Sequence, residues 1–312
     1  MTTVDAGADA HHPDLPLSVV VVSYRSPELV AECLAAIAAS TRAPAEIIVV
    51  DADPDGDRAL DAAAVAASSA IPTRAVPILG NPGYAAACNR GAAESTAAWV
   101  LFMNADVSVT SGCLEAVFAE AGSSEDIAIA TGALHLPDGS LDHACHRGIP
   151  TPLDSLAYKL RLHRVFPRSR RLGRYTMAWL DPAETHDVEA CSGAFLLIRR
   201  AALDAVGGWD ERYWFYAEDL DLCLRVSRGG DRVRYVGSAR ATHLKGASSH
   251  LRQDPRSLDA EQRATRQRVQ RAVVEAHDLF YREHLEARTP RLLRPLIAAQ
   301  FSLQRRRLRR AR

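Results

Sequence analysis

Leu17-Ser-Val-Val-Val-Val22 is a nearly unbroken run of β-branched residues. Such a run is typical of a strand covered on both faces of a parallel sheet. Beyond it, Ser26 offers a helix N-cap, Pro27 stands at the first helical position, and an apolar stripe continues to Ile37. Glu46-Ile-Ile-Val-Val50 then repeats the pattern of a buried strand. The sequence therefore predicts a strand, a crossover helix and a second parallel strand, the start of an α/β fold.

The alternation of strands and helices continues to residue 130 and predicts a Rossmann-like nucleotide-binding half. We expect its further helices near residues 58–69, 84–94 and from 111, and its further strands near 73–79, 98–103 and 127–130. Residues 137–187 have poor periodicity and many Arg, His and Pro, which predicts a loop-rich acceptor region or a mobile connection. Expected strands near 190–198 and 233–236, with helices near 200–206 and 218–228, complete a second half.

The composition is that of a folded, enzyme-sized protein, with 312 residues, 47% of them hydrophobic, and a formal net charge of zero. Its six cysteines show no CxxC pair and no metal-finger spacing, which fits a reducing, cytoplasmic setting. The N-terminus has no basic segment followed by an apolar core, and no stretch approaches the roughly 20 apolar residues of a membrane span. We therefore expect a protein that is neither secreted by a standard signal nor integral to a membrane.

Asp106 follows the predicted strand at residues 98–103 at the edge of the sheet where open α/β folds bind ligands. A diphosphate leaving group needs a divalent metal, and such a metal needs hard oxygen ligands at the end of a rigid element. The alternative is an Asx turn in which Asn104 and Asp106 only cap the next helix.

A second candidate cluster is Trp209-Asp-Glu-Arg-Tyr-Trp-Phe-Tyr-Ala-Glu218-Asp219-Leu-Asp221, where aromatic residues stand beside acids at a predicted helix N-terminus. A sugar site needs flat apolar faces beside carboxylates, and an inverting transfer needs one carboxylate as general base. Asp219 is the candidate base. The alternative is that Glu218, Asp219 and Asp221 only complement the positive end of the helix dipole.

Eight short motifs occur in one order between residues 18 and 248. They are Val21-Val-Ser-Tyr24, Val49-Val-Asp51, Asn81-Pro-Gly-Tyr-Ala-Ala-Ala-Cys-Asn89-Arg-Gly91, Phe102-Met-Asn-Ala-Asp106, Ser192-Gly-Ala-Phe-Leu-Leu-Ile-Arg199-Arg, Val206-Gly-Gly-Trp-Asp-Glu-Arg-Tyr213, Tyr216-Ala-Glu-Asp-Leu-Asp-Leu-Cys-Leu-Arg225 and His243-Leu-Lys-Gly-Ala-Ser248. With these motifs the chain resembles family 2 glycosyltransferases of the GT-A fold, and within them the bacterial rhamnosyltransferase-like branch. Each motif alone is common, whereas eight in register are specific.

The resemblance implies a role for each matching position. The catalytic residues would be Asp219, which deprotonates the acceptor, and Glu218. The residues expected to bind the nucleotide-sugar donor are Tyr24, Asp51, Asn81, Gly83, Asn89, Asn104 and Asp106. Those expected on the acceptor side are Ser192, Gly193, Trp209 and Asp210. Asp106 and His243 would hold the cofactor, Mn²⁺ or Mg²⁺, and a neutral imidazole suits Mn²⁺ in particular.

Two positions depart from the family pattern. Asn104 stands where the family's metal motif often has a first Asp, which leaves fewer anionic ligands. We therefore expect the metal to arrive largely on the donor diphosphate. Ala52 stands where the family usually has Asn or Asp, which removes a side chain that would contact the nucleobase. The sequence therefore leaves the nucleobase preference open.

The expected organisation is a polar leader at residues 1–16, a GT-A glycosyltransferase domain at 17–250 and a helical basic extension at 251–312. The domain is expected to divide into a nucleotide-sugar half at 17–130 and an acceptor and catalytic half at 131–250. Residues 291–312 carry eight Arg, seven large apolar residues and no acid. This pattern predicts an interfacial helix on anionic lipid at the inner face of the cell membrane. A helix packed on the body or on the partner in a homodimer is the alternative.

The predicted function is an inverting, metal-dependent transfer of a sugar, L-rhamnose from dTDP-rhamnose first, to a glycan or a polyprenyl-diphosphate-linked saccharide. A UDP- or GDP-sugar donor with a soluble natural-product or polysaccharide acceptor is the alternative. A sugar nucleotidyltransferase would need a Gly-rich loop where Ser23-Tyr-Arg-Ser-Pro stands. A catalytically inactive nucleotide- or glycan-binding module is opposed by Asp106, Asp219 and His243. Specific nucleic-acid binding is not expected, because the basic tail has no aromatic stacking partner beyond Phe301.

Overall fold

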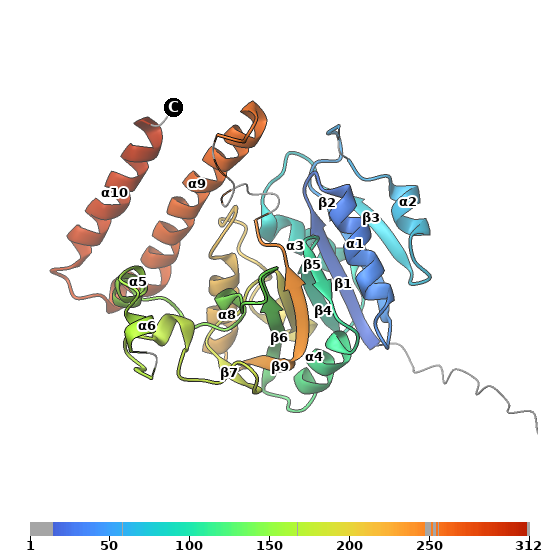
Figure 1. Ribbon diagram of the computed structural model, residues 1–312, viewed down its shortest axis with the longest axis horizontal. Coiled ribbons are helices and arrows are strands. Elements are labelled where there is room, and N and C mark those ends of the chain that lie inside the picture. The colour runs from blue at the N-terminus through green and yellow to red at the C-terminus, as the bar shows by residue number, and fades with distance from the viewer. Residues whose placement is uncertain are drawn as a thin grey trace, which may run out of the picture.

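A computed structural model describes residues 15–57, 59–166, 168–246, 251, 254 and 256–310. One mixed sheet runs through the centre of the molecule, in the order β3-β2-β1-β4-β8-β6-β9-β5, and β7 pairs with β9 (Figure 1). Its strands are β1 (Leu15–Ser23), β2 (Pro44–Asp51), β3 (Thr73–Pro77), β4 (Trp99–Asn104), β5 (Val107–Val109), β6 (Ile127–His135), β7 (His186–Val188), β8 (Phe195–Arg199) and β9 (Arg232–His243).

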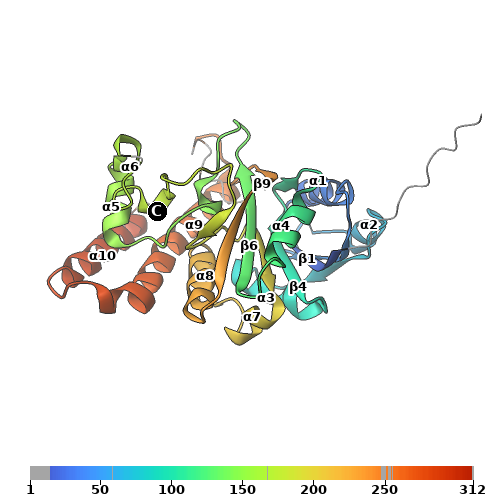
Figure 2. The ribbon, with the colours of Figure 1, turned by 90° about the horizontal axis from the view of Figure 1, so that it is seen from below.

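Helices cover both faces of this sheet, with α1 and α4 on one face and α3, α7 and α8 on the other (Figure 2). The helices up to residue 228 are α1 (Pro27–Ala38), α2 (Ala62–Ala67), α3 (Tyr84–Glu94), α4 (Cys113–Ala121), α5 (Pro152–Lys159), α6 (Leu162–Val165), α7 (Arg200–Ala205) and α8 (Glu218–Arg228). Short 3-10 turns lie at η1 (His143–Cys145) and η2 (Arg174–Thr176).

The N-terminal half has the predicted parallel pairing. β1 pairs in parallel with β2 and β4, and β2 pairs in parallel with β3. Val19, Val20 and Val21 in β1 have no exposed surface, as expected for a strand covered on both faces. The Rossmann-like half is therefore confirmed.

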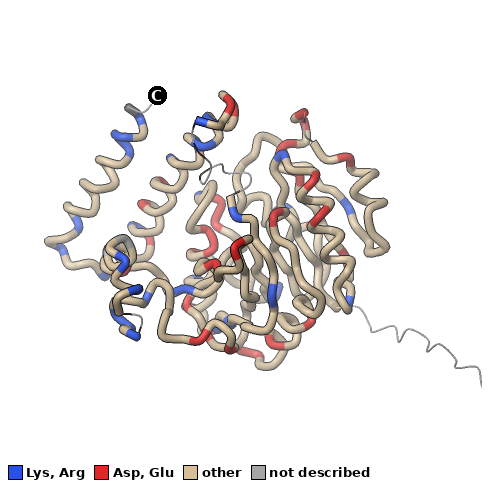
Figure 3. The backbone as a smooth tube through the Cα atoms, in the orientation of Figure 1, with Lys and Arg blue, Asp and Glu red and all other residues tan. Residues whose placement is uncertain are grey.

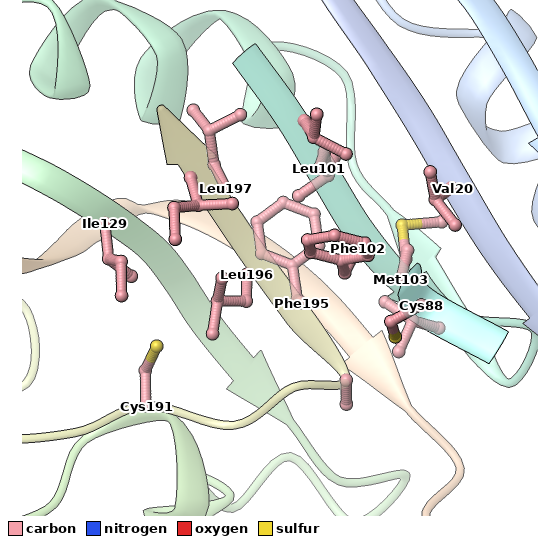
Figure 4. Close-up of a cluster of buried hydrophobic side chains, with 14 of the residues drawn as sticks. Val20, Cys88, Leu101, Phe102, Met103, Ile129, Cys191, Phe195, Leu196 and Leu197 are labelled. Atoms are coloured by element: carbon pink, nitrogen blue, oxygen red, sulfur yellow. The ribbon is translucent and has the colours of Figure 1, made fainter. Parts of the chain in front are cut away.

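The second half makes the sheet mixed. β8 is antiparallel to both β4 and β6, β6 is parallel to β9, and β5 is antiparallel to β9. Met103 on β4 is the register partner of Phe195 on β8, and Phe102 is the partner of Leu196, so these buried side chains contribute to the core on both faces of the sheet (Figure 4). All six cysteines are buried free thiols.

Several boundaries differ from the sequence prediction. The helix expected at 58–69 spans only Ala62–Ala67, and residue 58 lies outside the described residues. The strand expected at 190–198 begins at Phe195, and the strand expected at 233–236 continues to His243. β1 begins at Leu15, inside the expected leader, whose residues 1–14 lie outside the described residues.

Two long helices form the C-terminal extension, α9 (Ala260–Phe280) and α10 (Arg294–Arg310), joined through a π turn at η3 (Tyr281–Leu285) and a 3-10 turn at η4 (Glu286–Arg288). α9 starts with a capping box between Asp259 and Gln262. α10 packs back on α9, where Arg305 Nη1 donates to Asp278 Oδ2 at 2.7 Å. In the part of the chain that the structure describes, no helix is both long and apolar enough to cross a membrane.

Candidate active site

A cavity of about 820 Å³ opens at the carboxyl ends of β1 and β4, and α9 forms one of its walls. Its volume lies in the range of small-molecule sites. The predicted site residues that line it are Tyr24, Asn81, Gly83, Asn104, Asp106, Ser192, Gly193, Glu218, Asp219 and His243. The fold therefore brings motifs from both halves of the chain to one cavity.

Pairing of β5 with β9 brings Asp106 and His243 together. Val107 is the register partner of His243, and Leu244 N donates to Asp106 O at 3.0 Å. As a result, Asp106 Oδ1 lies 3.4 Å from His243 Nε2, and both side chains are nearly buried. Burial acts against the imidazolium, but hydrogen bonds to Asp106 and Asp142 outweigh it and raise the pKa of His243.

Asp142 lies behind this pair. Its Oδ2 is 3.2 Å from His243 Nδ1, and its Oδ1 pairs with Lys245 Nζ. Burial would raise the pKa of Asp142, but the contacts with His243 and Lys245 hold it well below its ordinary range. Asp142 also caps η1 by accepting from Ala144 N at 3.1 Å, so its carboxylate is held in place by its own turn.

Asp219 is held by a buried ion pair in the first turn of α8. Its Oδ2 accepts from Arg147 Nη2 at 2.7 Å and from Gly193 N at 3.2 Å, and its Oδ1 accepts from Leu220 N at 2.8 Å. Burial would lower the pKa of Arg147, but Asp219 and Tyr175 outweigh it and raise the pKa above its ordinary value. Asp219 is therefore fixed in orientation at the cavity wall.

Glu218 lies beside Asp219 but in a different environment. Within the described residues its buried Oε2 has no hydrogen-bond partner. Burial, reinforced by the neighbouring Asp219 carboxylate, raises the pKa of Glu218 to about 8. At neutral pH Glu218 is therefore mostly protonated.

The backbone before α8 is strained. Tyr216 and Ala217 have φ values of 74° and 66°, in the left-handed region that non-glycine residues rarely adopt. These two residues turn the chain from the aromatic segment at 213–216 into α8, which puts Glu218 and Asp219 in its first turn. Strained backbone of this kind is common at functional sites.

Four predicted site residues do not line the cavity. Asp51 accepts from Asp53 N at 3.0 Å and from Leu60 N at 2.9 Å, so it holds the loop after β2. Asn89 bonds both the N–H and the carbonyl of Trp209 at 2.9 Å, which attaches residues 206–213 to α3.

Trp209 is 2% exposed and lies under the site, where its ring meets Tyr84 and Phe102 edge to face. Asp210 pairs with Arg212 at 2.7 Å on the surface loop. The geometry thus gives Asp51, Asn89, Trp209 and Asp210 supporting contacts around the cavity.

The wall opposite the sheet comes from Trp214 and from α9. Trp214 Nε1 donates to Asn81 O at 2.9 Å, and the Arg268 guanidinium stacks over the Trp214 ring at 4.1 Å. Gly83 has φ +112°, and a Cβ there would lie 2.3 Å from Trp214 O. Only glycine allows this close approach.

The donor set fits a divalent cation bound together with a phosphate ligand. Two ligands at right angles, each about 2.1 Å from an octahedral ion, lie about 3 Å apart, close to the separation of Asp106 and His243. In the described residues no group of three or more His, Cys, Asp or Glu side chains is arranged to hold a metal. The remaining ligands would therefore have to come from a diphosphate and water.

The sequence did not predict several polar residues of this cavity, among them Asp142, Arg147, Lys245 and Arg268. Asp142 and Arg147 belong to residues 137–187, whose poor periodicity gave no local signal. Lys245 is part of the motif that begins at His243, but the motif gave it no role of its own. Arg268 lies on α9, which was assigned to the extension rather than to the site.

The chain matches the family model described as "Glycosyltransferase like family 2" over residues 13–267. It is 32% identical over 263 residues to the N-acetylglucosaminyl-diphospho-decaprenol L-rhamnosyltransferase of Mycobacterium tuberculosis, covering 80% of this chain and 82% of that protein.

Two solved structures share the fold. One is a mannosyltransferase from Pyrobaculum calidifontis in complex with GDP-Man and Mn²⁺, with a TM-score of 0.55, 16% identity, and coverage of 96% of this chain and 73% of that one. The other is GalNAc-T7 with UDP, GalNAc and Mn²⁺, with a TM-score of 0.54, 15% identity, and coverage of 85% of this chain and 49% of that one. The α/β fold is the predicted GT-A fold. The chain therefore belongs to glycosyltransferase-like family 2, is a glycosyltransferase, and falls in the rhamnosyltransferase branch of the family.

Proposed function

We propose that the chain is an inverting, metal-dependent glycosyltransferase that uses Asp219 as its general base. The observation that carries this proposal is that Asp219, paired with Arg147, lines the same cavity as the Asp106 and His243 pair. In this proposal one cavity would hold both a cation for the donor diphosphate and a fixed carboxylate for the acceptor hydroxyl.

Asp106 and His243 would hold Mn²⁺ or Mg²⁺ together with the donor diphosphate. A bound divalent cation supplies charge neutralisation for the departing nucleoside diphosphate. Asp142 orients the His243 ring through Nδ1, so that Nε2 is directed toward Asp106. Tyr24, Asn81 and Gly83 line the same cavity and would border the donor.

Asp219 would take the proton of the acceptor hydroxyl as that oxygen attacks the anomeric carbon. Arg147 and Gly193 N hold its Oδ2, and Leu220 N holds its Oδ1, so the carboxylate does not rotate away. Glu218, mostly protonated at neutral pH, is a poor competitor for this proton. A single fixed carboxylate beside the acceptor, with no second group placed as a nucleophile in this proposal, favours one displacement and inversion of the anomeric configuration.

L-Rhamnose from dTDP-rhamnose is the first proposed donor, and a polyprenyl-diphosphate-linked saccharide is the first proposed acceptor. The name of the mycobacterial relative supports both the sugar and the lipid carrier. A UDP- or GDP-sugar with a soluble acceptor is the second candidate, because Ala52 removes a nucleobase contact and Asp51 is bonded to its own loop. We place the enzyme in the cytoplasm, at the inner face of the membrane.

The C-terminal helix supports membrane contact only in part. Ile297, Phe301 and Leu308 are half-buried, and the Phe301 ring meets that of Tyr281, whereas Leu292, Leu293, Leu296 and Leu303 are exposed. The exposed Leu side chains and the neighbouring Arg residues are the part of α10 and the preceding turn available to lipid.

A thermal-shift screen of nucleotide sugars with Mn²⁺ tests the donor. A ligand at about 100 times its dissociation constant stabilises the fold by roughly 2.7 kcal/mol. We expect a shift with dTDP-rhamnose that disappears when a chelator is added. If only another nucleotide sugar gives a shift, that sugar would replace dTDP-rhamnose as the proposed donor. If NMR shows a product that retains the donor's anomeric configuration, the inverting mechanism would be overturned.

A further inference from the structure

The segment at residues 152–174, here called the basic hairpin, contains α5, α6 and the chain up to Arg174. It carries seven Lys or Arg and one Asp, a net charge of +6 in a protein whose total is zero. Among the described residues, Arg161, Arg164, Arg168 and Arg171 are exposed and pair with no carboxylate. Figure 3 shows the concentration of basic residues around α5 and α6.

The basic hairpin also exposes large apolar side chains. Leu153 is 66% exposed, Leu160 60%, Val165 67% and Phe166 50%. Exposed Leu, Val and Phe interleaved with unpaired Arg are the pattern of an interfacial segment, in which apolar groups enter the acyl boundary and cations meet anionic head groups. Nucleic acid would match the Arg residues but leave these apolar groups in water.

The same segment reaches the active-site cavity. Ser155 and Tyr158 of the basic hairpin line that cavity, as does Tyr175 directly after it. Tyr158 stacks on His163 at 5.0 Å and meets Tyr175 edge to face at 4.8 Å, so the hairpin and the cavity wall are packed together. A surface bound by the basic hairpin would therefore lie next to the mouth of the site.

The turn between α9 and α10 lies beside α5 in both ribbon views (Figures 1 and 2). This turn adds Leu292, 88% exposed, together with Arg288 and Arg291. Two elements that are far apart in the sequence therefore present the same combination of exposed apolar groups and cations at one end of the molecule.

We propose that the basic hairpin docks the enzyme on an anionic bilayer surface, with the cavity mouth beside the head groups. This inference rests on the proposed function in one respect, that a lipid-borne acceptor would enter from that surface. A twofold dimer through the same face is opposed by charge, because two surfaces of net charge +6 would be brought together.

Co-sedimentation of the full chain with vesicles tests the proposal. The vesicles contain phosphatidylglycerol and phosphatidylcholine in equal amounts, or phosphatidylcholine alone. The test variants are Val165→Asp with Phe166→Asp, and Arg161→Gln with Arg164→Gln. The matched control is Leu79→Asp, because Leu79 is 68% exposed but follows β3 at the opposite edge of the sheet.

We expect the wild type and the Leu79 control to bind anionic vesicles and to be released by salt. Loss of one Arg near the surface weakens binding by roughly fivefold, so the double Arg variant should bind about 25-fold more weakly. The apolar double variant should lose binding as well. Both variants should retain wild-type transfer to a short water-soluble acceptor.

Vesicle binding of both double variants equal to that of the wild type would overturn the proposal. A molar mass of the double variants that differs from that of the wild type in light scattering, together with unchanged vesicle binding, would also overturn the proposal. It would assign this face to self-association. If the wild type does not transfer sugar to the soluble acceptor, only the proposed function is contradicted. The docking proposal is unaffected, because co-sedimentation with vesicles does not depend on catalytic turnover.

Discussion

The carboxylate of Asp142 lies 3.2 Å from Nδ1 of His243, on the side of the ring opposite Asp106. A carboxylate at Nδ1 fixes both the tautomer and the orientation of an imidazole. His243 Nε2 is thereby kept directed at Asp106, whether or not a cation lies between them. Asp142 would therefore act as a positioning group in the proposed cation site.

Asp142→Asn should weaken metal-dependent nucleotide binding. The amide keeps the size of the side chain but removes the charge that holds the His243 ring, and loss of such a partner typically costs 10- to 100-fold in metal affinity. Titration calorimetry of dTDP with and without Mn²⁺ measures the effect. Asp138→Asn on the same exposed loop is the control, and wild-type affinity in the Asp142 variant would contradict this role.

Asp219→Asn should lower turnover by roughly 100-fold or more while donor binding survives, because the substitution removes the proposed general base. Steady-state rates measured beside a donor titration separate these effects. The exposed Asp204 on α7, changed to Asn, is the matched control. Loss of the fold together with loss of binding would instead make Asp219 a structural residue.

Glu218→Gln should change how stability depends on pH. The pKa of Glu218 is raised by burial to about 8 in the folded state against an ordinary value of 4.5. The folded state thus holds the proton more tightly, and its stability should fall with rising pH from about 5 to 8, by up to about 1.4 kcal/mol per pH unit.

Gln does not ionise, so the variant should lack this slope and be the more stable protein at pH 9. Urea unfolding at a series of pH values measures the slope, with the exposed Glu125→Gln as control. Parallel stability curves for the wild type and the Glu218 variant would contradict the burial argument.

Gly83→Ala should destabilise the fold and disturb the cavity wall. The residue has φ +112°, and the added Cβ would meet Trp214 O at 2.3 Å. Gly80→Ala is the matched control, because Gly80 has φ +74° with nothing within 4 Å of a Cβ.

The left-handed backbone alone costs about 1–2 kcal/mol, so Gly83→Ala should cost more than Gly80→Ala. Equal losses in the free energy of unfolding would mean that the Trp214 contact is not required. The same measurement in the presence of a bound nucleotide would show whether the cavity wall has moved.

The elements with a strong apolar period were predictable from the sequence. The helices at Tyr84–Glu94 and Glu218–Arg228 have the predicted boundaries, because Gly83 and Gly229 stand at their ends. β5 was missed because its three residues form a strand only by pairing with β9. The extension of β9 to His243 was missed for the same reason, because residues 240–243 are held in the strand by pairing with β5 and β6.

The candidate site was predictable where a motif carried it and not where tertiary contacts did. The motifs predicted Asp106, His243 and Asp219 as site residues, and all three line the cavity. Arg147 reaches Asp219 through a bridge between its own backbone and Ala190, a pairing across 43 residues that no local pattern reveals. The same is true of Arg268, which reaches Asn81 from the far end of the chain.

The burial of all six thiols has a practical consequence for experiments on this enzyme. Burial raises the pKa values of Cys33, Cys113 and Cys145. In the folded state these thiols are therefore protonated, and a reagent in solution does not reach them. A thiol reagent added without denaturant is therefore consumed only by molecules that have opened, and its rate of consumption measures how often the core opens. A cysteine introduced at an exposed position such as Leu160 would carry a fluorescent probe selectively, with all six native cysteines left in place.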